Sequence, residues 1–272
     1  MALERDLLEA ADLSAYLAQV TEVERELQRL FAPREALTIF DVGSCEGEDS
    51  IRYSRRFPRS RVYSFEPLPE NQSLATSNFA KFDAANVELI PLALSNAPGE
   101  ASFHVSSGRP ERLFCGERWN YGNKSSSLLM PAGEGPMFGW LSFERTIPVQ
   151  CETLERFCAD RRIERIDFLH MDVQGAEALV VQGAGKMMRR VVALWLEVAD
   201  REMYSGQELR ESMGRMLRKK GFALGFEVLR EGEGDQFYVN LRVPRVWWYL
   251  AMDRARRLKR RIAKAFVRHL GL

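Results

Sequence analysis

Paired cysteines and long apolar runs are both scarce in this sequence, and each shortage excludes a class of protein. Its four cysteines, Cys45, Cys115, Cys151 and Cys158, have a spacing that fits neither a CxxC metal site nor a disulfide framework. No segment holds about eighteen uninterrupted apolar residues, so no membrane span is expected. The amino terminus, MALERDLLEA, has charges where a signal peptide needs an apolar run. We therefore expect a cytoplasmic protein with reduced thiols.

Net charge is also nearly absent, because the 272 residues sum to +1 at pH 7. Such a balance argues against a general nucleic-acid binder. The charge is unevenly placed, however, since residues 254–268 contain eight Lys and Arg and no acidic residue. By subtraction the rest of the chain carries about −7. The 46% hydrophobic content can form the core of one large domain with extensions.

Apolar runs alternate with stretches of helical spacing along most of the chain. This alternation predicts the α/β class, with a Rossmann-like, doubly wound sheet of mainly parallel strands closed by one antiparallel strand. We expect strands at 37–43, 60–67, 86–94, 165–172, 191–198, 222–230 and 235–243, with residues 100–105 as a hairpin or an added edge. The helices are expected at 47–57, 69–82, 152–162, 175–189 and 206–220.

Three segments lie outside this alternation. Residues 1–36 form an amino-terminal helical extension, in which apolar residues at helical spacing predict one amphipathic helix over 13–31. Residues 243–272 form a basic amphipathic carboxy-terminal helix that begins near Pro244. The loop 106–146 lies inside the central domain, 37–242, and is rich in aromatic residues: Phe114, Trp119, Tyr121, Phe138 and Trp140. Loops of this length are usually functional or disordered, and disordered segments are poor in aromatics.

The turn DVGSCEG, between the first strand and the first helix of the central domain, predicts a nucleoside-type ligand site. Gly43 permits a tight turn, Gly47 lets the helix start close to a ligand, Asp41 can organise the loop, and Ser44 lies in the same turn. Glu66 ends the second strand, where a carboxylate can accept hydrogen bonds from both ribose hydroxyls of an adenosine ligand.

The acidity of this turn indicates which adenosine ligand it suits. A pyrophosphate needs GxGxxG and a helix amino terminus free of acid, whereas Glu46, Glu48 and Asp49 surround this turn. A cofactor with a cationic centre and no phosphate, such as S-adenosylmethionine, suits it better. The sequence therefore favours a methyl donor over a nicotinamide.

Five segments in order, FDVGSCEG, SFEPLPENQSLATSN, IPLALSNAPGEASFHV, SSSLL and IDFLHMDVQGAEALVVQGA, resemble the FkbM family of S-adenosylmethionine-dependent methyltransferases over about residues 37–241. The resemblance implies that residues 37–242 are a class I methyltransferase domain acting mostly on hydroxyls of sugars or secondary metabolites. It places Asp41, Gly43 and Gly47 around the methionine part of the cofactor, Glu66 at the ribose and Ala93 near the adenine. An NAD-dependent oxidoreductase and a non-catalytic adenosine-ligand-binding protein stay open as alternatives.

The stretch FLHMDVQGAE places polar groups at the mouth of a buried strand. His170 and Asp172 share one strand face, Glu177 begins the next helix, and Glu197 ends the following strand. We expect Asp172 to position the acceptor hydroxyl and His170 to take its proton, although the family usually has Lys at that position. Alternatively, Asp172 and Glu177 hold a Mg²⁺ that lowers the hydroxyl pKa. Structural roles also remain open: a core histidine, a helix cap at Asp172 and compensation of the helix dipole by Glu177.

The long loop and the basic tail predict contacts with partners. We expect loop 106–146 to be a substrate-selecting lid in which Trp119 and Tyr121, together with Glu177 and Glu197, contact a glycan or small-molecule acceptor; a dimer contact is the alternative. The tail can lie on anionic lipid at the inner membrane surface, dock on its own domain, or pair with a partner subunit in a homo-oligomer. Nucleic acid is not expected, because no stacking module accompanies the charge.

Overall fold

The computed structural model describes residues 12–113, 119–132 and 139–255. Its main sheet has seven strands in the order β3-β2-β1-β7-β8-β10-β9. All neighbours pair in parallel except β10, which runs antiparallel to both β8 and β9. The strands are β1 (Thr38–Val42), β2 (Arg61–Phe65), β3 (Val87–Ile90), β7 (Ile166–Met171), β8 (Val191–Ala199), β9 (Phe222–Arg230) and β10 (Glu233–Asn240). The α/β class and the antiparallel closing strand are as the sequence predicts.

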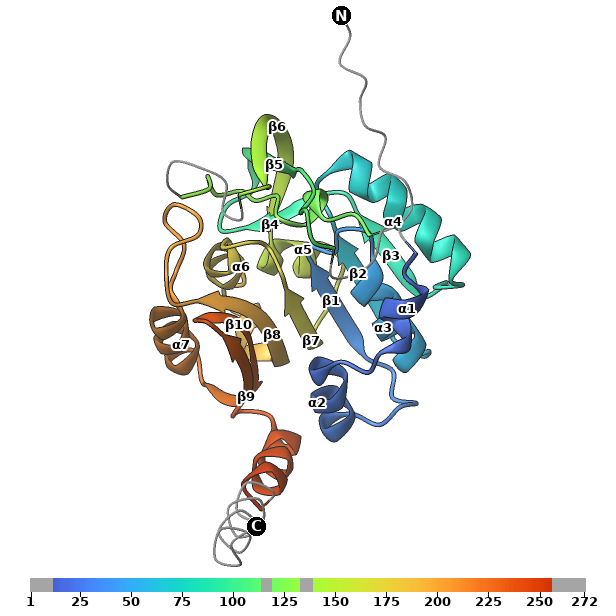
Figure 1. Cartoon of the computed structure of the whole chain (residues 1–272). Coiled ribbons are helices and arrows are strands. Elements are labelled where there is room, and N and C mark those ends of the chain that lie inside the picture. The colour runs from blue at the N-terminus through green and yellow to red at the C-terminus, as the bar shows by residue number, and fades with distance from the viewer. Residues whose placement is uncertain (1–11, 114–118, 133–138, 256–272) are drawn as a thin grey trace, which may run out of the picture.

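Helices cover both faces of this sheet (Figure 1). Because side chains alternate along a strand, Phe40 of β1 faces one hydrophobic cluster and Ile39 faces the other. The Phe40 side is covered by α5 (Leu154–Asp160), α6 (Glu177–Gly183) and α7 (Arg210–Lys219). The Ile39 side is covered by α2 (Glu22–Leu30) and α3 (Glu48–Arg56), while α4 (Pro69–Lys81) follows β2. The helices packed on the two faces of the sheet therefore hold the ends of its strands in place.

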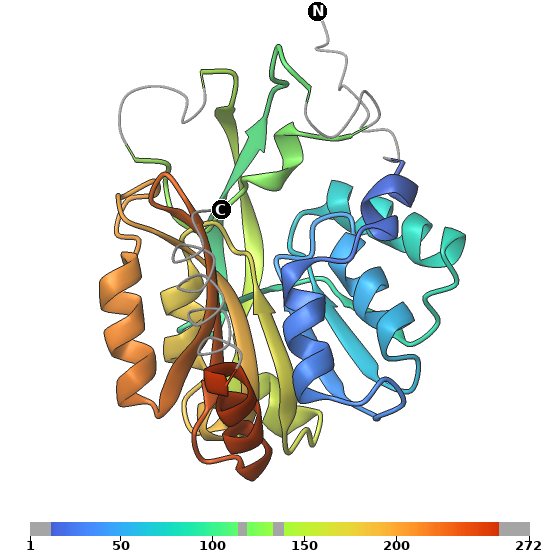
Figure 2. The ribbon, with the colours of Figure 1, turned by 60° about the horizontal axis from the view of Figure 1, so that its bottom comes forward.

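A second sheet of three strands stands above the carboxyl ends of the parallel strands (Figures 1 and 2). It has the order β4-β6-β5, with β4 (Ala93–Ser95), β5 (Gly99–Ser107) and β6 (Ser142–Thr153). The single strand predicted over 86–94 is wrong, because the chain leaves the main sheet at Pro91, which has no N–H to donate to a strand neighbour. Strand β6 was not predicted, and with β5 it shortens the long loop at both ends.

The predicted helix over 13–31 is two helices, α1 (Ser14–Ala18) and α2. Thr21 interrupts it with a capping box, in which its hydroxyl accepts from Glu24 N while the Glu24 carboxylate accepts from Thr21 N. A cap of this kind starts a new helix. The apolar spacing continues across the break, which is why periodicity alone did not find it.

The carboxy-terminal helix covers residues 244–255 of the described chain and is anchored to the main domain. Val246 and Tyr249 are buried against it, and Tyr249 Oη donates to Glu26 Oε2 at 2.5 Å. Residues 256–272, which include most of the predicted basic helix, lie outside the described residues. No helix in the described part of the chain is long and apolar enough to cross a membrane.

Candidate active site

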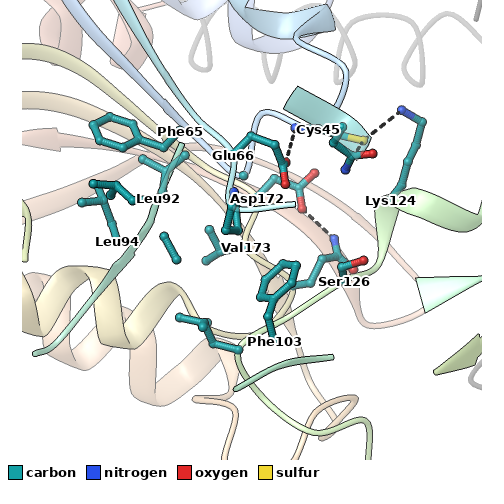
Figure 3. Close-up of a pocket in the computed structure, with 18 of the residues that line it drawn as sticks. Cys45, Phe65, Glu66, Leu92, Leu94, Phe103, Lys124, Ser126, Asp172 and Val173 are labelled. Atoms are coloured by element: carbon teal, nitrogen blue, oxygen red, sulfur yellow. Dashed lines mark hydrogen bonds between the residues drawn. The ribbon is translucent and has the colours of Figure 1, made fainter. Parts of the chain in front are cut away.

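A narrow cavity opens at the carboxyl ends of β1, β2 and β7, beneath the small sheet (Figure 3). One side is apolar, and its lining comprises Phe65, Leu92, Ala93, Leu94, Phe103, Leu128 and Val173. The other side is polar and includes Glu66, Asn71, Asn123, Lys124, Asp172 and Gln174. An apolar wall beside polar groups suits a nucleoside, with its base on the apolar side. Only about 40 Å³ is free, so a ligand of that size requires the lining to open.

Glu66 reaches this cavity at the end of β2 and also braces the turn after β1. Its Oε2 accepts from Cys45 N at 2.9 Å, and its Oε1 accepts from Leu68 N at 2.7 Å. Burial raises the pKa of Glu66 to about 8, although these backbone bonds act to lower it. The carboxyl group is therefore held rigidly at the cavity wall, where in its ionised form each oxygen can still accept a further hydrogen bond.

The two glycines of the turn are required for different reasons. Gly43 has φ +82°, and a Cβ there would lie 2.0 Å from the Asp172 carbonyl oxygen, so Gly43 lets the turn lie against the end of β7. Gly47 has φ +78°, and a Cβ there would lie 2.3 Å from the Phe79 ring of α4. Packing of α3 on α4 is thus one reason for Gly47, and the predicted one, approach of the helix to a ligand, stays a prediction.

Asp41 and Ser44 support the turn from behind, and neither lines the cavity. Asp41 Oδ2 accepts from Ser50 Oγ at 2.6 Å, and Ser44 Oγ accepts from Ser64 Oγ at 2.7 Å. Both side chains are buried. These bonds join the turn to α3 and β2, so a role of either residue in cofactor binding stays a prediction.

Residues 119–128 cross the mouth of the cavity and bond to the acidic turn. Asn123 Nδ2 donates to Glu46 Oε1 at 3.0 Å and to Asn71 Oδ1 at 2.9 Å. Lys124 Nζ bonds to Glu48 Oε1 at 2.5 Å. Asn123 Oδ1, Glu46 Oε2 and Glu48 Oε2 are buried without a hydrogen-bond partner. Unsatisfied buried acceptors are costly, and a cationic ligand group with N–H donors would satisfy acceptors of this kind.

A second, wider cavity of about 270 Å³ adjoins the first. Its aromatic walls are Trp119, Tyr121, Trp140 and Tyr204, and its polar lining includes Lys124, Asp172, Gln174, Glu197, Gln207 and Glu233. Lys124, Asp172 and Gln174 line both cavities. Of the predicted acceptor contacts, the structure thus brings Trp119, Tyr121 and Glu197 together with Asp172. The shared residues mark where a donor and an acceptor would meet.

Gln174 connects the groups at this junction, and the sequence prediction missed it. Its Nε2 donates to Asp172 Oδ1 at 2.6 Å and to Glu197 Oε2 at 3.0 Å. Its Oε1 accepts from Tyr204 Oη at 3.0 Å. Gln174 also has φ +54°, which is unfavourable for a side chain other than glycine and clusters at functional sites. The available signal was its place within DVQGAE, between a strand end and a helix.

His170 lines neither cavity and is buried in the wall behind them. Its Nδ1 lies 3.2 Å from Asp41 Oδ1 and 3.0 Å from Tyr53 Oη. Burial alone would lower the pKa of His170, but the Asp41 carboxylate raises it to about 9. An imidazole that is charged at neutral pH cannot accept a proton. The role of His170 as general base stays a prediction, and the geometry favours a supporting role.

Glu177 also lines neither cavity, because its carboxyl group turns back to its own chain. Its Oε1 accepts from Val173 N at 3.1 Å, and burial raises its pKa to about 8. Among the described residues, no group of three or more His, Cys, Asp and Glu side chains could hold a metal ion. A Mg²⁺ site at Asp172 and Glu177 stays a prediction, as does contact of Glu177 with the acceptor.

Comparison with known proteins decides the family. The model of the methyltransferase FkbM domain matches residues 41–224, which is more than half of the chain. This chain belongs to the FkbM methyltransferase family. The FkbM domain uses S-adenosyl-L-methionine as methyl donor, so the chain is a methyltransferase, and the oxidoreductase and binding-protein alternatives are set aside.

Two curated relatives extend over most of this FkbM methyltransferase. The 2-O-methyltransferase NoeI of Sinorhizobium fredii is 27% identical over 82% of this chain and 86% of its own. Methyltransferase sdnD of Sordaria araneosa is 24% identical over 80% of this chain and 88% of its own. Among solved structures, fibrillarin of Aeropyrum pernix with S-adenosyl-L-methionine is 15% identical, with a TM-score of 0.42, over 80% of this chain and 74% of that one.

The cavity residues fit the cofactor of the FkbM family. Glu66 would offer two carboxyl oxygens to a ribose, the apolar side would offer a surface to an adenine, and Asp172 is the other acidic side chain of the lining. Asn123 lines the cavity, and its buried Oδ1, which has no hydrogen-bond partner, would suit the ammonium group of the methionine part. When bound, the cofactor supplies a methyl group activated by attachment to a positively charged sulfur.

The raised pKa values predict that the ligand-free protein loses stability as pH rises. Glu66 and Glu177 have folded pKa values of about 8, and His170 has about 9, against ordinary values of about 4.3 and 6.5. Between its ordinary pKa and its folded pKa, each group binds more protons in the folded state than in the unfolded state. As pH rises through that range, each group therefore lowers the free energy of unfolding by at most ~1.4 kcal/mol per pH unit. Urea unfolding at pH 6.5 and 8.5 should show lower stability at pH 8.5, and Glu66→Gln should reduce the difference. Equal stability at both pH values would contradict these protonation states.

Proposed function

We propose that this enzyme transfers the methyl group of S-adenosyl-L-methionine to a hydroxyl of a sugar that carries no negative charge. The observation that carries this proposal is the second cavity, which has aromatic walls and opens onto the first through Asp172 and Gln174. Aromatic rings pack on the apolar faces of sugar rings, and the surrounding amide and carboxyl groups can bond to hydroxyls. The name of the relative NoeI, a 2-O-methyltransferase, supports oxygen as the methylated atom.

Asp172 is the group we assign to the acceptor hydroxyl. It follows β7 directly and lines both cavities, so it can hold a hydroxyl between them and accept its proton. Burial raises the pKa of Asp172, although the hydrogen bond from Gln174 and the charge of His170 act to lower it, and a raised pKa makes its carboxylate a stronger base. Gln174 orients Asp172 through its 2.6 Å bond. His170, held by Asp41 and Tyr53, positions the end of β7 from behind.

The charge of the second cavity favours a neutral sugar. Glu197 and Glu233 line it together with Asp172. The pKa of Glu197 is raised first by burial and then by Asp172, so another negative charge there would be disfavoured. Lys124, the lysine among the described lining residues, already bonds to Glu48 at 2.5 Å. An anionic acceptor would therefore be disfavoured by the same burial and by the charge of Asp172, and the described lining residues offer no unpaired cation to offset them.

Two matched acceptors test this proposal. We expect methyl transfer from radiolabelled S-adenosyl-L-methionine to p-nitrophenyl glycosides of neutral sugars in a panel that varies the hydroxyl configuration. The corresponding uronic acid should react at least about tenfold more slowly, which corresponds to ~1.4 kcal/mol. Equal rates for a sugar and its uronic acid would contradict the charge preference alone. Binding of S-adenosylhomocysteine without methylation of any glycoside would contradict the sugar acceptor.

A further inference from the structure

The carboxy-terminal helix over 244–255 presents two different faces. One face is anchored, since Val246 and Tyr249 are 0% and 3% exposed and Arg245 Nη1 bonds to Glu35 Oε1 at 2.5 Å. The other face carries Trp247, Trp248 and Met252, which are 58%, 77% and 52% exposed. The helix is therefore fixed to the domain while its large apolar side chains point to solvent.

This exposed face differs from the scattered apolar residues found on most protein surfaces. Trp248 and Met252 are four residues apart and Trp247 is adjacent, so the three side chains lie along one side of the helix. Two small residues, Ala251 and Ala255, continue the same side and are exposed. Tryptophan is enriched where water meets lipid, because its ring is apolar and its N–H is polar.

The charge of the sequence that follows this exposed face indicates which kind of surface the face contacts. Residues 254–268 carry eight Lys and Arg and no acidic residue. Anionic lipid headgroups would attract them, and a basic segment next to exposed Trp is the pattern of a lipid-binding helix.

The position of the helix leaves the active site free. The helix follows β10, which runs antiparallel to its neighbour β8 and therefore ends at the amino ends of the parallel strands. Figures 1 and 2 show it at the end of the molecule opposite β5 and β6. Both cavities lie at the other end of the sheet, so a surface that binds this helix does not cover them.

We propose that Trp247, Trp248 and Met252 insert into the headgroup region of an anionic membrane, whose negative charge attracts the positive charge of the sequence that follows them. The enzyme is then held at a membrane surface with its cavities directed away from the lipid. This inference does not depend on the identity of the methyl acceptor.

Vesicle sedimentation with the full chain tests this inference. We expect binding to phosphatidylcholine vesicles that contain phosphatidylglycerol to be at least about tenfold stronger than binding to phosphatidylcholine alone, and to weaken with salt. Trp247→Ala/Trp248→Ala should lower the binding about tenfold or more. Met252→Ala should weaken it measurably, whereas the matched control Met130→Ala, 60% exposed elsewhere, should not.

Cofactor affinity, measured by calorimetry with S-adenosylhomocysteine, should be unchanged in the Trp variant and would show that it is folded. Equal binding of the Trp variant and the original chain to anionic vesicles would overturn the inference, as would no binding by either. A dimer in solution that the Trp substitutions dissociate would also overturn it, because the face would then belong to a second copy.

Discussion

Asp172→Asn is expected to lower the turnover rate by about 10²- to 10⁴-fold, the usual contribution of a general base. The substitution keeps the shape of the side chain and an oxygen for Gln174 Nε2, which is 2.6 Å away, but removes the charge that would accept the hydroxyl proton. Steady-state rates with a glycoside that the enzyme methylates would measure the chemistry, and calorimetry with S-adenosylhomocysteine would measure the binding of the cofactor. Cofactor affinity should change far less than turnover.

Three companion variants make this result specific to the junction of the cavities. Asp160→Asn, at the exposed end of α5, should leave turnover unchanged. Gln174→Ala should reduce turnover less than Asp172→Asn, because it releases the carboxylate without removing it. His170→Gln should mainly lower thermal stability, since the imidazole is buried beside Asp41.

The alternative assignments predict other results. A loss of about 10²-fold or more in His170→Gln, with stability and cofactor affinity retained, would make His170 the base. Loss of activity in EDTA with recovery in Mg²⁺ would favour the metal alternative. Full turnover in Asp172→Asn would mean that the polar groups after β7 are structural.

Glu66→Ala is expected to weaken S-adenosyl-L-methionine binding at least tenfold. If each Glu66 oxygen accepts from one ribose hydroxyl, the substitution removes two charge-assisted bonds worth about 1.5–3 kcal/mol each, and ~1.4 kcal/mol corresponds to tenfold. It also removes the acceptors for Cys45 N and Leu68 N. Calorimetry would give the affinity, and Glu70→Ala, on the first turn of α4, is a matched control.

The same carboxyl group predicts a pH dependence of cofactor affinity. Because burial raises its pKa to about 8, Glu66 is mostly protonated at neutral pH, and binding two hydroxyl donors favours the carboxylate. Affinity should therefore rise with pH up to about pH 8, by at most tenfold per unit. The rise should vanish in Glu66→Gln.

Unchanged affinity in Glu66→Ala would contradict both predictions, because it would show that the ribose binds elsewhere.

Local sequence patterns predicted the parts of the fold that depend on neighbouring residues. Helix α4 begins at Pro69 and helix α3 follows the positive-φ turn at Gly47, as Pro and Gly in those places indicate. Strand β6 was missed, because its residues Ser142–Thr153 are mostly half-buried or exposed and lack an apolar run. A strand in a small second sheet is stabilised by its partners β4 and β5, and a single chain segment does not show which partners it will meet.

The residues of the site divide in the same way. The sequence by itself determined the family, the acidic turn after β1 and the place of Glu66 and Asp172, because strand ends in a parallel sheet meet at one edge. Only the tertiary structure decided that His170 pairs with Asp41 behind that edge and that Gln174 joins Asp172 to Glu197 in front of it. The physical reason is that the position of a strand fixes where its backbone ends, whereas Asp41, the partner of His170, and Glu197, a partner of Gln174, are distant from them in the chain.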